Sequence, residues 1–163
     1  MRKFLVLTVI IVMTLSLLAG CGGGSNSGPS CKDILETVKN GTEDGFDTMY
    51  TMGDDEYKDN FEFLYGITWD MIDDGGIIYT ESGGLADEIS IVHLKDQGDI
   101  SLAKEKFSDR LSDRKNTFSG YKPEEVYKLD SARIIVQGNY VALVIAEDSG
   151  AMETIIRDAV TNS

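Results

Sequence analysis

The residues most able to do chemistry in this sequence are its acidic side chains, which could bind a cation or work as a catalytic pair. Aligned with a calcium-binding loop, Asp70, Asp74 and Glu81 fall at positions one, five and twelve, where such a loop places oxygen ligands. Position three is Ile72, which has no oxygen to donate, and the residues that follow favour a strand over a helix. We therefore expect a turn that enters a strand, with the three acids as candidate metal ligands in an incomplete loop.

Asp87 and Glu88 are the second acidic candidate, because they stand where an apolar run expected to form a strand begins. In that position they could protect a sheet edge or form a turn, or they could contact a cation or a partner. His93 is the single histidine, and no His or Cys cluster offers it a partner for a metal site or catalytic triad, which favours a satisfied strand histidine. The spacing Ser101-x-x-Lys104 copies a serine acylase motif without its other parts. We find no catalytic constellation, and we expect a protein that is not an enzyme and needs no cofactor.

Cys21 lies in a pattern typical of lipid attachment. A basic start precedes residues 4–18, an apolar run that is too short for a transmembrane helix but matches a signal peptide. The sequence Leu18-Ala19-Gly20-Cys21 then resembles the lipobox of bacterial lipoproteins, in which the thiol receives a diacylglycerol before cleavage. We expect residues 1–20 to be a signal peptide, and the lipid on Cys21 to hold the protein on the extracytoplasmic face of the cell membrane.

The residues after Cys21 predict a flexible linker followed by one domain. Residues 22–30 have no apolar side chain to bury, and nine such residues reach about 17 Å. We therefore expect an anchor and linker over 21–30 and a single domain over 31–163. Cys31 has no CxxC neighbour, which favours an inert thiol at a helix start over an intermolecular disulfide.

The charge of the chain restricts its partners. The formal net charge is −13, from 15 basic and 28 acidic residues, and loss of Arg2 and Lys3 with the signal peptide leaves 13 against 28, or −15. Phosphate backbones repel such a domain, so we expect no nucleic-acid partner. Anionic lipid headgroups repel it as well, so we expect membrane contact through the lipid on Cys21 only.

The period of the apolar residues alternates between helical and extended values along the domain. Strand patterns come in two pairs, each pair separated by a glycine turn, and helix patterns lie before, between and after them. This order predicts an α+β fold, with a four-stranded antiparallel sheet made of two hairpins and packed on helices. The helices are expected near 31–40, 54–65, 99–118, 123–129 and from 149 onward, and the strands near 77–80, 88–94, 133–137 and 140–146.

This pattern leads to two predictions about which residues are buried. The strands at 133–137 and 140–146 are almost continuously apolar, which predicts central positions in the sheet for both. The helix from residue 99 has an apolar stripe that includes Phe107 and Phe118, and Arg110 and Arg114 are expected mostly outside it.

Several segments from about residue 61 onward resemble a known family. In order they are Phe63–Ile67, Leu85–Ile91, Arg110-Leu111, Lys115–Tyr121, Pro123–Glu125 and Gln137–Val141. Together they look like a lipoprotein family of Gram-positive bacteria, domain of unknown function 4358, over about residues 50–160. The resemblance implies a location, as a membrane-anchored lipoprotein, and a fold. It implies no site residues.

These observations favour a membrane-anchored binding or accessory module that acts outside the cell on a protein, a peptide or a cell-wall component. The alternative is a small extracytoplasmic hydrolase, or a cation-binding protein, that uses clustered carboxylates such as Asp87 and Glu88.

Overall fold

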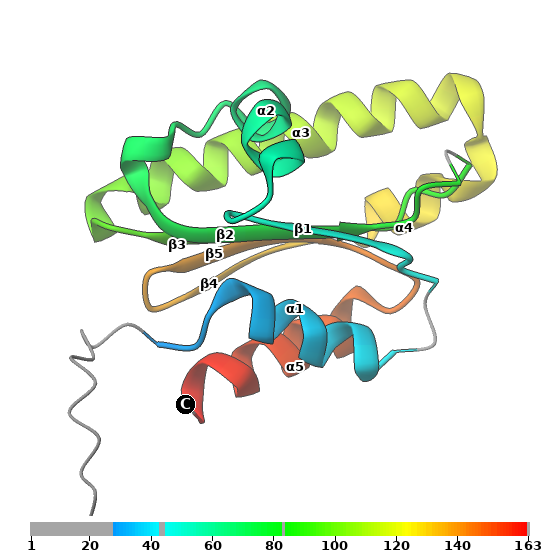
Figure 1. Ribbon diagram of the computed structural model, residues 1–163. Helices are drawn as coiled ribbons and strands as arrows, with labels where there is room; N and C mark the ends of the chain where they lie inside the picture. The colour runs from blue at the N-terminus through cyan, green and yellow to red at the C-terminus, as the bar shows by residue number, and fades with distance from the viewer. Residues whose placement is uncertain (1–27, 43–44, 83, 163) are drawn as a thin grey trace, which may run out of the picture.

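The computed structural model describes residues 28–42, 45–82 and 84–162. The predicted signal peptide, Cys21 and most of the predicted linker lie outside these residues, as does Gly83 of the predicted turn. The described chain forms three layers, in which helices cover both faces of one antiparallel sheet (Figure 1). The helices of this part of the chain include none that is long and apolar enough to cross a membrane.

The strand order in the sheet is β1-β2-β3-β5-β4. Helices α1 and α5 cover one face, and α2 and α3 cover the other (Figure 1). The elements of the described residues are α1 (Cys31–Asn40), β1 (Thr48–Thr51), α2 (Asp55–Tyr65), β2 (Ile72–Tyr79), β3 (Glu88–Leu94), α3 (Ile100–Tyr121), α4 (Val126–Asp130), β4 (Arg133–Gln137), β5 (Tyr140–Ile145) and α5 (Ser149–Thr161).

The predicted α+β class and both predicted hairpins are confirmed, but the expected count of four strands is wrong. A fifth strand, β1, pairs with β2 inside a segment expected to be a loop. Strand β2 also begins five residues earlier than expected, at Ile72, with a register shift before Asp74. The start of β2 was not predicted because Gly75 and Gly76 have no side chains and so break the apolar alternation typical of a strand. Both glycines are nevertheless buried in the sheet.

The positions of two strands differ from expectation. Strand β4 pairs only with β5 and is an edge strand, whereas β5 is internal as predicted. Strand β3 lies between β2 and β5, so an edge-protecting role for the acids at its start is wrong. The edge strands of the sheet are β1 and β4, and other side chains protect them. Asp54 bonds both the N–H and the C=O of Thr51 on β1, and Arg157 of α5 donates to the Val136 carbonyl of β4.

Helix α1 begins where the sequence predicts, and two side chains fix its start. The Ser30 hydroxyl accepts the Asp33 N–H at 3.1 Å, and the Asp74 carboxylate accepts the Cys31 N–H at 2.7 Å. The helix then packs Ile34, Leu35 and Val38 against the sheet. The chain thus enters the domain on the α1 side.

Helix α2 is seated on the opposite face by an aromatic row. Tyr57, Phe61 and Tyr65 recur every four residues, are almost fully buried, and lie with successive ring centroids 4.8 and 5.2 Å apart. The Tyr57 hydroxyl lies against Gly75 of β2, where an added Cβ would approach it to 2.4 Å. Absence of a side chain at Gly75 is therefore what lets α2 approach the sheet.

We predict that Gly75→Ala lowers the free energy of unfolding by about 1–3 kcal/mol, because the new methyl group overpacks against Tyr57. Adding Tyr57→Phe restores much of this loss, since the hydroxyl removed is buried without a hydrogen-bond partner. Urea denaturation measures both effects. Gly120→Ala is the control, because no atom lies within 4 Å of its added Cβ. Equal stability of Gly75→Ala and the wild type would contradict this packing.

Candidate functional site

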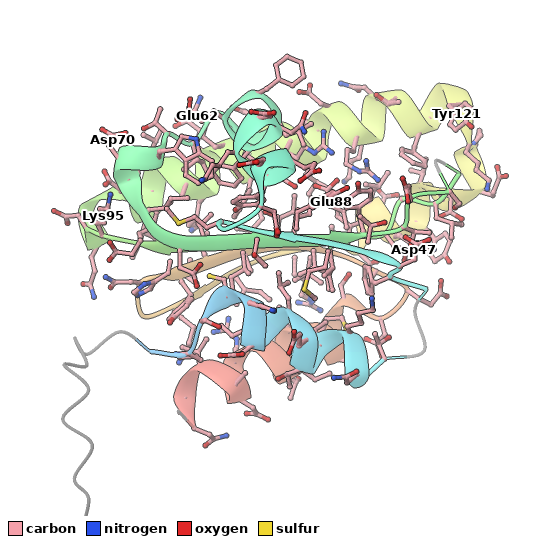
Figure 2. All side chains as sticks on the ribbon, in the orientation of Figure 1. Asp47, Glu62, Asp70, Glu88, Lys95 and Tyr121 are labelled. Carbon is pink, nitrogen blue, oxygen red and sulfur yellow. The ribbon has the colours of Figure 1, made fainter. Side chains whose placement is uncertain are left out.

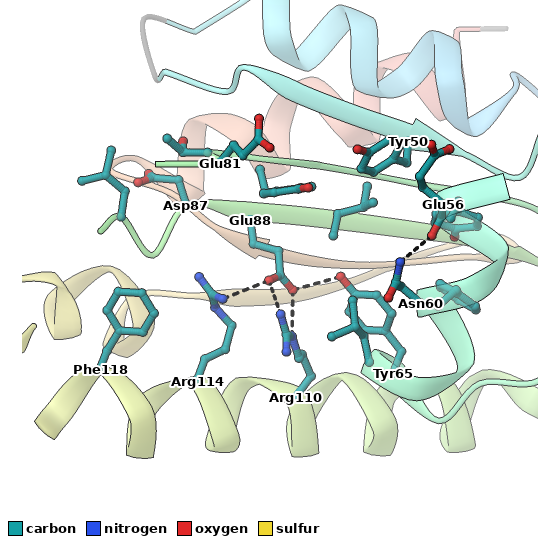
Figure 3. Close-up of a pocket in the computed structure, with 17 residues that line it drawn as sticks. Tyr50, Glu56, Asn60, Tyr65, Glu81, Asp87, Glu88, Arg110, Arg114 and Phe118 are labelled. Atoms are coloured by element: carbon teal, nitrogen blue, oxygen red, sulfur yellow. Dashed lines mark hydrogen bonds and ion pairs between the residues drawn. The ribbon is translucent and has the colours of Figure 1, made fainter. Parts of the chain in front are cut away.

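A cavity of about 440 Å³ lies between α2, α3 and the sheet (Figure 3). Its size is in the range of small-molecule sites in proteins. Strands β1, β2 and β3 form one wall, and the segment between β2 and β3 closes one end. The lining residues on the sheet side are Tyr50, Ile77, Tyr79, Thr80, Glu81, Leu85, Asp87 and Glu88, and those on the helices are Glu56, Tyr57, Asn60, Phe61, Leu64, Tyr65, Arg110, Arg114 and Phe118.

The walls of this cavity are mostly aromatic and aliphatic. Phe61 and Ile77 belong to the buried core, and half-buried Leu64 packs against them from α2. Tyr50 of β1 and Tyr79 of β2 lie on adjacent strands, with ring centroids 6.2 Å apart. Such walls favour an apolar or aromatic ligand body.

The polar base of the cavity is the carboxylate of Glu88, the first residue of β3. Only 2% of Glu88 is exposed, and three side chains contact its two oxygens (Figure 3). Arg110 donates from Nε to Oε1 at 3.1 Å and from Nη2 to Oε2 at 2.7 Å. The Tyr65 hydroxyl donates to Oε1 at 3.0 Å, and Arg114 Nη1 lies 3.4 Å from Oε2. A bidentate arginine and a phenol therefore hold this carboxylate in place.

These contacts keep Glu88 ionised despite its burial. Burial alone would raise the pKa of the carboxyl, but the hydrogen bonds and charge of Arg110, with the charge of Arg114, hold its pKa below the ordinary value. Burial and the neighbouring Glu88 raise the pKa of the Tyr65 phenol well above its ordinary value. Tyr65 therefore remains a hydrogen-bond donor at physiological pH.

Arg114 retains hydrogen-bonding capacity that the protein does not use. Its Nη2 donates to the Ala86 carbonyl at 2.9 Å, and its guanidinium lies 5.0 Å from the Phe118 ring centre. Its Nε–H has no partner among the described residues, and Arg110 already makes the closest contacts with Glu88. An N–H group left unbonded in a buried place is costly, so this arginine is held in place by its contacts with Ala86 and Glu88 at the cost of one unmade hydrogen bond.

A second set of buried charges adjoins the first at the end of the cavity. Lys128 of α4 donates to Asp87 at 2.7 Å and lies 3.1 Å from Glu125. Glu125 in turn accepts the Ala86 N–H at 3.0 Å. These contacts join the segment before β3 to the region around α4. Asp87 and Glu88, for which a cation or partner contact was the alternative to an edge or turn role, thus both form internal ion pairs.

The incomplete calcium loop does not bring its acids together. Asp70 precedes β2 and Glu81 follows it, and eight extended residues at about 3.3 Å each separate them. Figure 2 shows Asp70 at the opposite end of the molecule from Asp47, which accepts the Glu81 N–H. Asp74 lies between them and bonds backbone N–H groups of Cys31 and Gly75. Within the described ranges no group of three or more His, Cys, Asp or Glu side chains is placed to hold a metal ion.

Two other residues singled out from the sequence lie away from the cavity. Cys31 is the first residue of α1 and is fully buried, and burial together with Asp74 raises the pKa of its thiol well above the ordinary value. This placement agrees with an inert thiol and not with an intermolecular disulfide. His93 is half-buried and stacks on Tyr140, with ring centroids 4.4 Å apart.

Sequence reasoning missed the two arginines of this site. The expectation that Arg110 and Arg114 lie mostly outside the buried stripe of α3 is wrong, because both line the cavity. A signal was present: together with Phe107, Leu111 and Phe118 they follow the three- and four-residue spacing of one helix face. Charged residues that share the spacing of a buried helix face are candidates for buried ion pairs, but their partner on β3 is set by tertiary packing.

Comparison with known proteins supplies a family for this architecture. The family model described as Domain of unknown function (DUF4358) matches residues 47–146, which is more than half of the chain. The chain belongs to this family. The matched residues run from just before β1 to just after β5, so they contain the whole sheet and the whole cavity. No curated protein and no solved structure matched the chain.

We predict that Glu88→Gln lowers the free energy of unfolding by about 3–5 kcal/mol at pH 7, because it leaves two arginines without their buried counter-charge. The lowered pKa of Glu88 means that its contribution is present above the ordinary value of 4.5 and is lost as pH falls through the lowered pKa. Urea denaturation at several pH values should therefore show the variant and wild type converging in acid. Exposed Glu105→Gln is the control, and a gap that does not change with pH would contradict this assignment.

Proposed function

We propose that this protein is a lipid-anchored binding module of the extracytoplasmic face, and that its ligand occupies the cavity between α2, α3 and the sheet. The observation that carries the binding role is a cavity of about 440 Å³ with aromatic walls and an ordered polar base. Sites for small molecules combine an apolar lining with a few fixed polar groups in this way.

The state of Glu88 favours binding over acid–base catalysis. A general acid at neutral pH needs a raised pKa, and a general base needs a free lone pair aimed at its substrate. Glu88 has a lowered pKa, and Arg110 and Tyr65 occupy its oxygens. We therefore assign the pair Glu88 and Arg110 to shaping the base of the cavity.

The anchoring role rests on Cys21 and on where the chain enters the domain. Cys21 stands in the lipobox-like sequence Leu18-Ala19-Gly20-Cys21, ten residues before α1 starts at Cys31. The chain enters on the α1 side of the sheet, and the cavity lies on the opposite side (Figure 1). A lipid on Cys21 would thus leave the cavity on the face turned away from the point of attachment.

We expect mass spectrometry of the native protein from a bacterial membrane to find the mature chain starting at Cys21 with a diacylglycerol on its thiol. Cys21→Ser should abolish the modification and the recovery with membranes. Cys31→Ser is the matched control and should leave both unchanged, because Cys31 is buried. An unmodified Cys21 in native protein would contradict the anchor.

Binding in the cavity is tested with 4-phenylbutan-1-ol, a neutral probe with an aromatic body and one oxygen. We expect it at millimolar concentration to raise the melting temperature, because a ligand that binds only the folded state stabilises it. Leu64→Trp fills the cavity and should remove the shift. Leu102→Trp adds the same ring at an exposed position of α3 outside the cavity and should keep it. Equal shifts in both variants would count against the cavity as the site, once circular dichroism shows that both are folded.

A further inference from the structure

The buried charges around the cavity cancel one another. The six side chains of the two ionic sets are the acids Asp87, Glu88 and Glu125 and the bases Arg110, Arg114 and Lys128. Three negative and three positive charges leave the interior formally neutral. A ligand that brought a net charge to this interior would have to break a buried pair, which is unfavourable.

The opening of the cavity, by contrast, has an excess of negative charge. Glu56 of α2 and Glu81 after β2 line the cavity and are exposed. Among the residues that the structure describes, neither carboxylate forms an ion pair with a Lys or Arg side chain. Figure 3 shows Tyr50 between them along the β1 side. The rim therefore offers two uncompensated carboxylates around an aromatic residue.

Tyr50 and Tyr79 provide aromatic faces at the same place. Their rings are tilted by 39°, with centroids 6.2 Å apart. Partial burial and the nearby Tyr50 raise the pKa of Tyr79, so its phenol stays neutral at physiological pH. Neutral tyrosine rings attract organic cations through their π electrons, and adjacent carboxylates strengthen that attraction.

We propose that the ligand of this cavity is a small organic ammonium ion, with its cationic group against Tyr50 and Tyr79 in the electrostatic field of Glu56 and Glu81, and its apolar body between α2 and the sheet. This inference rests on the proposed function, because it names the chemical class of the ligand that the cavity binds. The negative net charge of the chain, −13, would also raise the local concentration of such cations.

Two other ligand classes fit the structure less well. A carboxylate placed at Arg114 would add a net negative charge to an interior that is already neutral, and Glu56 and Glu81 at the rim would repel it. An extended peptide would need a free strand edge beside the cavity, and Asp54 already bonds the outward N–H and C=O of Thr51 on β1.

The test uses three probes with one apolar body: 4-phenylbutylamine, 4-phenylbutan-1-ol and 4-phenylbutyrate. Isothermal titration of the lipid-free domain with each probe measures its dissociation constant. We expect the amine to bind about fivefold to tenfold more tightly than the alcohol, which is the scale of an exposed cation–π and ion-pair contact. The carboxylate should bind more weakly than the alcohol.

Two double variants assign the effect to the rim. Glu56→Gln with Glu81→Gln should bring the amine to the affinity of the alcohol and leave the alcohol unchanged. Glu36→Gln with Asp158→Asn removes the same charge from exposed positions on α1 and α5, and should keep the preference for the amine. An amine that binds no better than the alcohol, or that keeps its advantage in the rim variant, overturns this inference alone. Absence of binding for all three probes overturns the proposed function with it.

Discussion

The ion pair between Glu88 and Arg110 is the interaction on which the cavity side of this fold depends. Glu88 begins an internal strand and is removed from water, which costs several kcal/mol for an ionised carboxylate. That cost is offset only if α3 brings Arg110 and Arg114 to it and α2 brings Tyr65. One carboxylate thus fixes the positions of a strand and two helices.

The second ionic set extends the same constraint to the end of the cavity. Asp87 precedes Glu88 in the chain but pairs with Lys128 of α4, which also contacts Glu125. The segment before β3 is therefore held on one side by α3 and on the other by the region around α4. A cavity bounded by such fixed groups is formed before any ligand arrives, which lowers the cost of binding.

The sequence predicted the parts of this fold that depend on local pattern. Both hairpins, the capped start of α1 and the apolar stripe of α3 follow from turn chemistry and periodicity. Strand β1 could not be predicted, because its four residues are only half-buried and gain their extended form from pairing with β2. The site was missed because burial of Glu88 with Arg110 is a property of tertiary packing, and charged residues usually indicate solvent. Asp87 and Glu88 were candidates for an edge, turn, cation or partner contact, and both instead form buried ion pairs within the domain.

The central claim is that the space between α2, α3 and the sheet is a ligand site with a fixed base. It is tested most directly by nuclear magnetic resonance of isotope-labelled protein titrated with 4-phenylbutylamine. We expect saturable shifts and intermolecular contacts from the probe ring to Leu64, Ile77 and Phe118 in the cavity, with the Glu88 carboxyl ionised throughout. Contacts scattered over the surface, or confined to the α1 and α5 face, would contradict the account.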